Sequence, residues 1–600
     1  MFRSIKRPGA SRCGRAPLTT VGRAVGLAVG FSFGFSVLFY AAATQAVIPT
    51  PTVTGPIPGD TPGSASRNYT YWATDIVLKN FGFVEEEFFF EGTANRYDAA
   101  NPSGGVGNAA RCTPIANIVS SNHAYKSRMR VIRPTDPAKF NGTVIVEWTN
   151  VTNGYDTPVW WLKPKAFYLR EGYAYVEVSA QNAGLNNQPN GLRNWSPTRY
   201  SSLNVNAGGA LPADVLSYDI FSQAAAAVRN VPIVLGGLQA QRVIGVGESQ
   251  SAGRLGVYAN GIHSRDRIYD GIIMSEGGEI ICNNAPTKVM KVLSETEFAG
   301  QTNEIPTLQD DTDVFRMWAI AGMSHSDQYS LLSRAALLQR DINTLAQDAC
   351  ATPARSRVET RYFYASSIDA MVKWVRFNTP PPIGDRFILT NAPNAGVARD
   401  SFGNALSAIR SAEIDVPVAK EAADTCGLGG THVPFTTAVL KTLYSSHQDY
   451  VDRFTAAAMS SVAKGFVLLA DAQESIERAK SSPWGTGLEC GPLCADVRQF
   501  PLNPSSMLLR NQTAFLIIRG AEFKLLPILD KTTLAIAEGY TLGLGTDASK
   551  QKFAQAALLL QSYISNVQLL LLSGNTKPET AKLLSDQATT LRNLVLAQSQ

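Results

Sequence analysis

The chain has 600 residues, of which 45% are hydrophobic and 17% are charged. This composition is that of a globular protein, and it excludes a disordered chain or an integral membrane protein. The formal net charge is +5, but residues 1–46 contain six basic residues and no acidic one, so the remainder carries 5 − 6 = −1. The charge therefore indicates no nucleic-acid partner.

Residues 1–46 have the pattern of a secretory signal peptide. A basic segment leads into an apolar stretch over residues 24–43, and Thr44 and Ala46 offer small residues at the −3 and −1 cleavage positions. An uncleaved anchor is the alternative, because the apolar stretch approaches spanning length. Its glycines and its cleavage-like end favour removal, so we expect a periplasmic or secreted protein without stable membrane insertion. Residues 47–65 then read as a flexible leader.

Six cysteines remain after this cleavage: Cys112, Cys282, Cys350, Cys426, Cys490 and Cys494. An even number in an exported chain favours disulfides, although the sequence does not reveal their pairing. Cys490 and Cys494 are spaced to close a small loop. A metal site is the other interpretation of that spacing, but no histidine lies nearby to complete it, so we expect a disulfide.

Short apolar runs alternate with longer segments from about residue 124 to residue 325. The runs predict buried strands at 142–148, 173–178, 242–246, 270–274, 289–293 and 315–320. Segments such as 217–229 and 253–263 predict helices between them. This alternation is typical of an α/β fold with a mostly parallel sheet flanked by helices.

The later part of the chain is mainly helical. Residues 362–377 predict an amphipathic helix that ends before three prolines, and further helices are predicted at 450–464, 465–480, 553–572 and 578–600. We therefore divide the mature chain into an α/β domain at 66–480 and a mainly helical C-terminal extension at 481–600. The run Leu569–Leu572 is expected to lie in a helix core rather than in a membrane.

The segment from Val243 to Gly253 predicts a strand, a sharp turn that carries a serine, and a helix. Such a turn is a nucleophile elbow, which needs very small residues two positions before and after the nucleophile. Ser249 satisfies this with Gly247 and Ser251, whereas Ser251 would have Ser249 and Gly253. We favour Ser249, because it stands directly at the strand end after a glycine.

An activated serine needs a histidine base, and in hydrolases of this kind the acid and then the histidine follow the serine along the chain. His325 follows the predicted strand at 315–320 and lies downstream of Ser249, so it is the leading candidate. His263 ends the helix after the elbow, and His123 precedes the serine.

The acid that orients His325 should follow the strand at 289–293, where Glu295 and Glu297 stand. We favour Glu297, because the acid normally stands a few residues beyond its strand, and Glu295 is the alternative. Glu276 and Glu279, after the preceding strand, are weaker alternatives.

The oxyanion hole requires two backbone N–H donors. Gln250, which follows the nucleophile, should supply one, and Thr149 or Asn150, after the strand at 142–148, should supply the other. Trp160 and Trp161 follow and either line a substrate pocket or belong to the core.

These motifs together resemble a family of large exported proteins described as alpha/beta hydrolase domain-containing. The matching blocks are 140–151, 172–176, 247–254, 294–297, 318–327, 399–410 and 416–418. The resemblance covers roughly residues 65–480. It implies an α/β-hydrolase fold, with inserted helical cap elements after the histidine, and a triad of Ser249, His325 and one of the paired glutamates.

The leading functional hypothesis is a carboxylic ester hydrolase that forms an acyl-enzyme on Ser249. A serine peptidase or amidase, or an acyltransferase, would use the same triad. A non-catalytic exported binding protein of the same fold is the alternative from a different class. No metal or organic cofactor is expected, and the expected partner is a small-molecule or polymeric ester. The oligomeric state is left open.

Overall fold

The computed structural model describes residues 48–99, 116–282, 287–299, 302–344, 355–390, 396–480 and 522–599, together with Cys350, Leu509 and Thr513. The predicted signal peptide, Cys112 and the Cys490–Cys494 pair lie outside the described residues.

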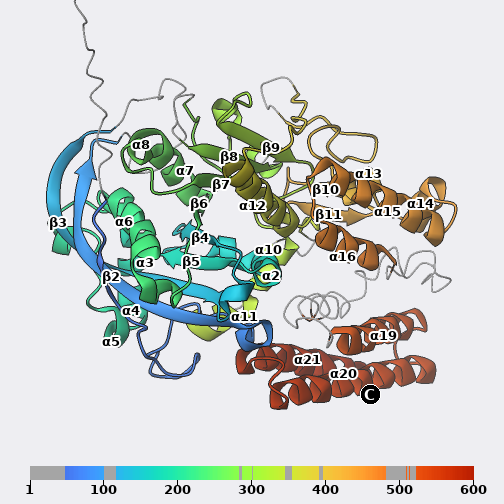
Figure 1. The fold of residues 1–600 in the computed structure, drawn as a ribbon. Coiled ribbons are helices and arrows are strands. Elements are labelled where there is room, and N and C mark those ends of the chain that lie inside the picture. The colour runs from blue at the N-terminus through green and yellow to red at the C-terminus, as the bar shows by residue number, and fades with distance from the viewer. Residues whose placement is uncertain are drawn as a thin grey trace, which may run out of the picture. The chain divides into compact units, whose positions relative to one another are not determined.

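A nine-stranded sheet organises the described part of the chain (Figure 1). Its strands are β1 (Thr52–Thr54), β2 (Phe83–Tyr97), β3 (Ile118–Pro134), β4 (Thr143–Trp148), β5 (Ala174–Val178), β6 (Arg242–Glu248), β7 (Gly271–Ser275), β8 (Lys288–Ser294) and β9 (Phe315–Ile320). They lie in the order β1-β2-β3-β5-β4-β6-β7-β8-β9. The pairings from β5 through β9 are parallel, and those from β1 to β5 are antiparallel. A second sheet pairs β10 (Ala419–Ala422) with β11 (Thr431–Pro434).

The six parallel strands confirm the predicted mostly parallel sheet, but β1, β2 and β3 were not predicted from the sequence. The expected flexible leader contains β1, which pairs with β2 through Thr52 opposite Glu91. In β3, Arg128 and Arg130 are fully buried and bind Glu177 of β5. Buried arginines interrupt the apolar pattern that marks a strand, because their charge is neutralised only in the folded sheet.

Helices fill the connections between strands and most of the chain after them. They are α1 (Val159–Leu162), α2 (Lys165–Glu171), α3 (Asn182–Asn186), α4 (Leu192–Trp195), α5 (Pro197–Tyr200), α6 (Ser217–Asn230), α7 (Gln250–Val257), α8 (His263–Asp266), α9 (Thr296–Ala299), α10 (Gln328–Ser333), α11 (Ala335–Leu337), α12 (Thr360–Phe377), α13 (Ala412–Asp415), α14 (Thr437–Leu443), α15 (His447–Lys464), α16 (Leu469–Lys480), α19 (Glu522–Thr541), α20 (Asp547–Leu572) and α21 (Pro578–Ser599).

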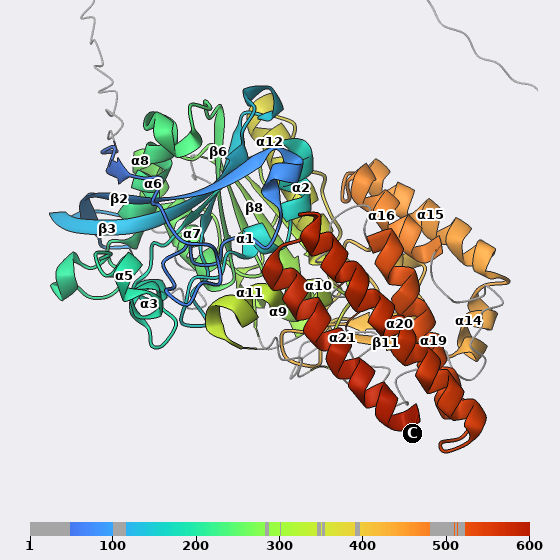
Figure 2. The ribbon, with the colours of Figure 1, turned by 90° about the horizontal axis from the view of Figure 1, so that it is seen from below.

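Helices cover both faces of the sheet, and two neighbouring residues of β4 show how. Successive strand residues point to opposite faces. The Glu147 carboxylate accepts a hydrogen bond from the backbone N–H of Trp160 in α1, whereas the ring of Trp148 packs against Phe221 of α6 at 4.8 Å. Tyr364 of α12 lies 4.3 Å from Trp160, so α12 belongs to the α1 face (Figure 2).

The helices α19, α20 and α21 share a core of their own, which confirms that the C-terminal extension is mainly helical. Leu560 and Leu584 are fully buried in it. The expectation for Leu569–Leu572 is wrong in part, because Leu569 and Leu572 are 61% and 83% exposed. The helix α20 is long and apolar enough to cross a membrane by composition alone, but a third of its most apolar window is buried within the protein.

The parallel register brings the carboxyl ends of all six parallel strands to one edge of the sheet. Trp148 lies opposite Gly247, Glu248 lies opposite Ser275, and Ser294 lies opposite Ile320. The segments that leave these ends begin with the residues singled out in the sequence. This edge therefore gathers the candidate site.

Candidate active site

Ser249 lies in a strained turn between β6 and α7. Its backbone has φ 54° and ψ −114°, a positive φ that is uncommon for a residue other than glycine. A Cβ at Gly247 would lie 2.9 Å from Leu255 Cδ1 and 3.0 Å from the Ser251 carbonyl oxygen, so this position requires glycine. The Ser249 N–H donates to the Ser275 carbonyl at 2.8 Å and so ties the turn to β7.

Ser251, the alternative nucleophile, has a different environment. It is fully buried, and its hydroxyl donates to the Glu248 carbonyl at 2.9 Å and accepts from the Glu248 N–H at 3.0 Å. Ser249 is partly exposed. The hydroxyl of Ser251 therefore holds the turn together, while that of Ser249 stands at the turn's outer side.

His325 leaves the end of β9 and meets Glu297 from the end of β8. Its Nδ1 lies 2.8 Å from Glu297 Oε1, and both side chains are buried. The backbone supports this pair, because the His325 N–H donates to Thr296 Oγ1 at 3.1 Å and the Ser294 N–H donates to Glu297 Oε2 at 2.7 Å. The structure thus brings His325 and Glu297 together.

Glu295 has other partners. Its Oε1 accepts from Arg399 Nη2 at 2.7 Å and from the Ala423 N–H at 3.0 Å, and its Oε2 accepts from the Gly322 N–H at 2.8 Å. The contact with Gly322 anchors the loop that precedes the histidine, and the other two join Glu295 to later segments of the chain. Glu297 therefore contacts the histidine ring, whereas Glu295 binds the surrounding backbone and Arg399.

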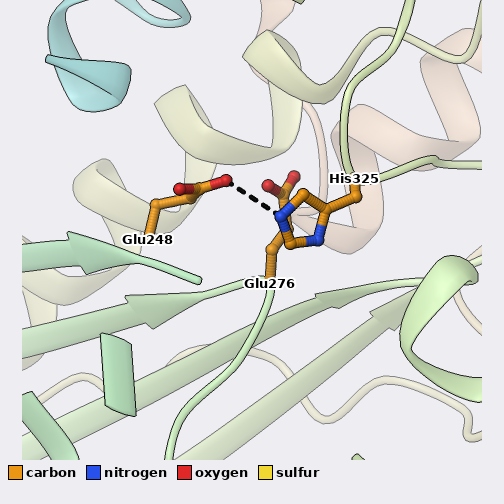
Figure 3. A group of neighbouring side chains, drawn as sticks. All are labelled: Glu248, Glu276 and His325. Carbon is orange, nitrogen blue, oxygen red and sulfur yellow. Dashed lines mark ion pairs between the residues drawn. The ribbon is translucent and has the colours of Figure 1, made fainter. Parts of the chain in front are cut away.

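A second carboxylate contacts the other nitrogen of His325 (Figure 3). Nε2 lies 3.2 Å from Glu248 Oε1, and no hydrogen bond joins it to the Ser249 hydroxyl among the described residues. Burial alone would lower the pKa of His325, but the bonds to Glu248 and Glu297 raise that pKa well above its ordinary value. Burial likewise opposes ionisation of Glu248, and the bond to His325 lowers its pKa.

A buried ion pair underlies this group, and the sequence did not reveal it. Lys163 Nζ lies 2.7 Å and 2.8 Å from the two carboxylate oxygens of Glu276, and it also donates to the His325 carbonyl at 3.2 Å and to Tyr364 Oη at 3.1 Å. Burial raises the pKa of Glu276, against the opposing effect of Lys163. The carboxylate of Glu276, a weaker candidate for the acid, is thus paired with Lys163.

Glu248, Glu276 and His325 offer ligand atoms within 4.8 Å of one another, a spacing that suits a metal ion. The donor set is already engaged in other ways. Nε2 of His325 contacts Glu248, and both oxygens of Glu276 bind the Lys163 ammonium group. Lys163 therefore supplies at this place the positive charge that a metal would bring.

The candidate oxyanion donors surround the turn. Gln250 is the first residue of α7, so its N–H has no acceptor within the helix. The Thr149 N–H donates to the Val178 carbonyl at 3.5 Å. Asn150 forms an isolated antiparallel bridge with Thr157, whose N–H donates to the Asn150 carbonyl at 2.8 Å, and the Asn150 side chain holds the Glu248 carbonyl at 3.1 Å. Both residues proposed after β4 therefore have a backbone N–H that faces another carbonyl group, and these contacts do not separate them.

Trp160 and Trp161 belong to the core. Trp160 is fully buried against Tyr364, and Trp161 donates its ring N–H to Thr74 Oγ1 at 3.2 Å. The expectation that they line a substrate pocket finds no support in these contacts.

The other histidines have partners away from the elbow. His123 contacts Ser120 Oγ at 2.8 Å, and His447 contacts the Ala479 carbonyl at 3.2 Å. His263 accepts from a backbone N–H, and burial lowers its pKa to about 4. His432 pairs with Glu421. Within the described ranges, His325 is the histidine that meets a carboxylate at this edge of the sheet.

A pocket opens beside the turn, with a volume of about 350 Å³. Its lining comes from the segments that follow β4, β5 and β6 and from the segment before α6: Val151, Thr152, Gln181, Ala213, Asp214, Gln250 and Arg254. Gln250 is the direct neighbour of Ser249, so the pocket adjoins the candidate nucleophile.

Comparison with known proteins gives one family match. A family model described as "Alpha/beta hydrolase domain" matches residues 53–477. A glucuronoyl esterase from Solibacter usitatus is 12% identical over 43% of this chain and 72% of that chain, with a TM-score of 0.21. The structure of esterase Est22 is 12% identical over 43% and 70%, with a TM-score of 0.22. No curated protein matches the chain.

Proposed function

The chain belongs to the alpha/beta hydrolase domain family, and from this premise we propose that it is a serine-dependent carboxylic ester hydrolase that forms an acyl-enzyme on Ser249. The observation that carries the proposal is the location of Ser249, in a strained elbow at the end of β6, and of the His325–Glu297 pair at the same edge of the sheet. Serine, histidine and acid also follow one another in the order that this fold uses.

In the proposed reaction, His325 Nε2 accepts the proton of the Ser249 hydroxyl as its oxygen attacks the ester carbonyl. The N–H group of Gln250, together with that of Thr149 or Asn150, stabilises the oxyanion of the tetrahedral intermediate. The imidazolium then protonates the departing alcohol, which leaves an acyl group on Ser249. A water molecule, deprotonated by the same histidine, releases the acid and restores the serine.

The first step requires His325 Nε2 to turn from Glu248 to Ser249. Glu297 holds Nδ1 at 2.8 Å, and in the proposed reaction this contact is kept while Nε2 exchanges Glu248 for Ser249. Glu297 then fixes the tautomer that carries its proton on Nδ1 and stabilises the imidazolium.

A substrate panel on wild type and S249A tests the proposal. Alkyl and aryl esters, the matching amides, and an ester with an added acceptor alcohol are each followed by product analysis. We expect ester hydrolysis in wild type and none in S249A. Amide cleavage would favour the peptidase, transfer to the alcohol would favour the acyltransferase, and a lack of any turnover would favour the binding protein.

We also propose that the protein is exported. The basic, acid-free segment before residue 47 supports this, and so does the Cys350–Cys426 disulfide, because such bonds persist in oxidising compartments. Mass spectrometry of the protein from its native host should find a mature N-terminus near Val47. An intact N-terminus would contradict the proposal.

A further inference from the structure

The pocket beside the elbow contains one acid, and the acceptor atoms of that acid are occupied. Asp214 Oδ1 accepts from the Asn182 N–H at 2.6 Å. Its Oδ2 accepts from Arg254 Nη2 at 3.2 Å and from Gln181 Nε2 at 3.4 Å. Asp214 is therefore a filled acceptor that positions Arg254.

The two glutamine side chains of the pocket also have their acceptor atoms engaged. Gln181 Oε1 accepts from the Trp148 ring N–H at 3.0 Å. Gln250 Oε1 lies 3.5 Å from the Val151 N–H, at the limit of a hydrogen bond. These contacts leave little acceptor capacity in the side chains of the lining.

The groups that lack partners are donors. Arg254 is 4% exposed, and its guanidinium carbon lies 5.9 Å from the centre of the Tyr218 ring, but its Nε and Nη1 make no hydrogen bond of normal geometry in the described part of the chain. No hydrogen bond of Gln250 Nε2 or of the Thr152 hydroxyl is found there either. Arg254 is also the only cation in the lining of this pocket. A pocket with surplus donors and a guanidinium group matches an acceptor-rich anion, because arginine binds carboxylates through paired N–H groups.

We propose that this pocket, lined by Thr152, Gln181, Asp214, Gln250 and Arg254, binds a free carboxylate of the substrate. The preferred substrates are then esters that carry a second, unesterified carboxyl group a few atoms from the ester bond. This inference rests on the proposed function, because Gln250 joins the pocket to Ser249. Arg254 is the specificity-determining residue, and Asp214 is its positioning residue.

The test compares esters that differ only in charge. On the acyl side, monomethyl adipate is compared with the methyl ester of adipic acid monoamide. On the alcohol side, the butyrate ester of glycolic acid is compared with that of glycolamide. The readout is the ratio of kcat/KM for each carboxylate to kcat/KM for its carboxamide. We expect this ratio to be at least about tenfold on one of the two sides in wild type.

Three variants give the expected pattern. R254Q should lower the ratio to about 1, and D214N should lower it by a smaller factor, because the amide cannot accept both of the hydrogen bonds through which Oδ2 holds Arg254 and Gln181. R453Q is the matched control, since Arg453 pairs with Asp449 on the exposed face of α15 and should keep the wild-type ratio. D214N provides an independent result should R254Q fail to fold.

A ratio of about 1 or less on both sides in wild type would overturn the inference, as would an unchanged ratio in D214N or in a folded R254Q. If the carboxamide esters are still hydrolysed in that case, the proposed esterase function is retained and only the carboxylate-binding pocket is rejected. Loss of all hydrolysis, together with a serine that a fluorophosphonate does not label, would defeat both.

Discussion

His325 is held between two carboxylates, with Nδ1 2.8 Å from Glu297 Oε1 and Nε2 3.2 Å from Glu248 Oε1. Glu297 orients the ring through Nδ1. Glu248 contacts Nε2, the nitrogen that accepts the serine proton in the proposed reaction. This arrangement stabilises the imidazolium form. It therefore links the activity to pH through the residue that precedes the nucleophile.

E248Q should move the acidic limb of the kcat/KM profile to lower pH. Burial lowers the pKa of His325, but the bonds to Glu248 and Glu297 raise it well above its ordinary value. Wild type therefore needs alkaline pH to free the base, and loss of one carboxylate makes the neutral imidazole available at lower pH.

The pH dependence of the free energy of unfolding of E248Q provides an independent control. A histidine whose pKa is raised by folding contributes stability that is lost as the pH rises through that raised pKa. The depressed pKa of Glu248 contributes stability that is lost as the pH falls through it. The stability gap between wild type and E248Q should therefore be widest between the ordinary pKa values of glutamate and histidine, 4.5 and 6.5, and should narrow as the pH rises above or falls below that range. An acidic limb that E248Q leaves in place would contradict this role of Glu248.

E297Q should lower kcat by roughly 10²- to 10⁴-fold, because the amide neither fixes the tautomer of His325 nor stabilises its imidazolium. E295Q is the matched control, two residues away in the same buried loop. It should lower the melting temperature by weakening the contact with Arg399, with a smaller effect on kcat. Steady-state kinetics and thermal unfolding of both variants decide between them. A collapse of kcat in E295Q with a mild effect in E297Q would reverse the assignment.

K163M should destabilise the protein by about 3–5 kcal/mol, because it leaves the buried Glu276 carboxylate without its partner. The double variant K163M/E276Q should recover part of this loss. K373M is the control, since Lys373 forms an exposed pair with Asp369 and its loss should cost less than about 1 kcal/mol. Urea unfolding of all three gives the free energies. A double variant no more stable than K163M would show that the lysine contributes through something other than this pair.

The double variant C350A/C426A should lose about 2–4 kcal/mol of stability, since the disulfide joins residues 76 positions apart. It should also lose activity. The chain just after Cys426 holds the histidine loop, because the Ser326 N–H donates to the Leu428 carbonyl at 2.8 Å. Thermal unfolding and ester turnover below the melting temperature check the two effects separately. Full turnover in the variant would show that the loop keeps its shape without the bond.

The parallel half of the sheet could be predicted from the sequence, and the antiparallel half could not. Strands buried on both faces are nearly continuous apolar runs, such as β7, and these stand out. The strand β3 hides Arg128 and Arg130 in its interior, and only the glutamates of its neighbours make that burial favourable. Those partners come from distant parts of the chain, so no local sequence pattern predicts them.

The same division applies to the candidate site. Ser249, His325 and Glu297 follow from strand ends and chain order, because a parallel sheet brings those ends to one edge. Lys163 and the contact of Glu248 with His325 depend on side-chain directions in loops that periodicity does not describe. A lysine that follows two buried tryptophans was the one available signal, and it is a weak one.

The most direct test of the central claim is to locate the residue that a fluorophosphonate labels. Wild type, S249A and S251A are treated with the reagent, digested and mapped by tandem mass spectrometry. We expect one adduct on Ser249 in wild type and in any folded S251A, and none in S249A. An adduct on Ser251, or undiminished labelling of S249A, would contradict the account.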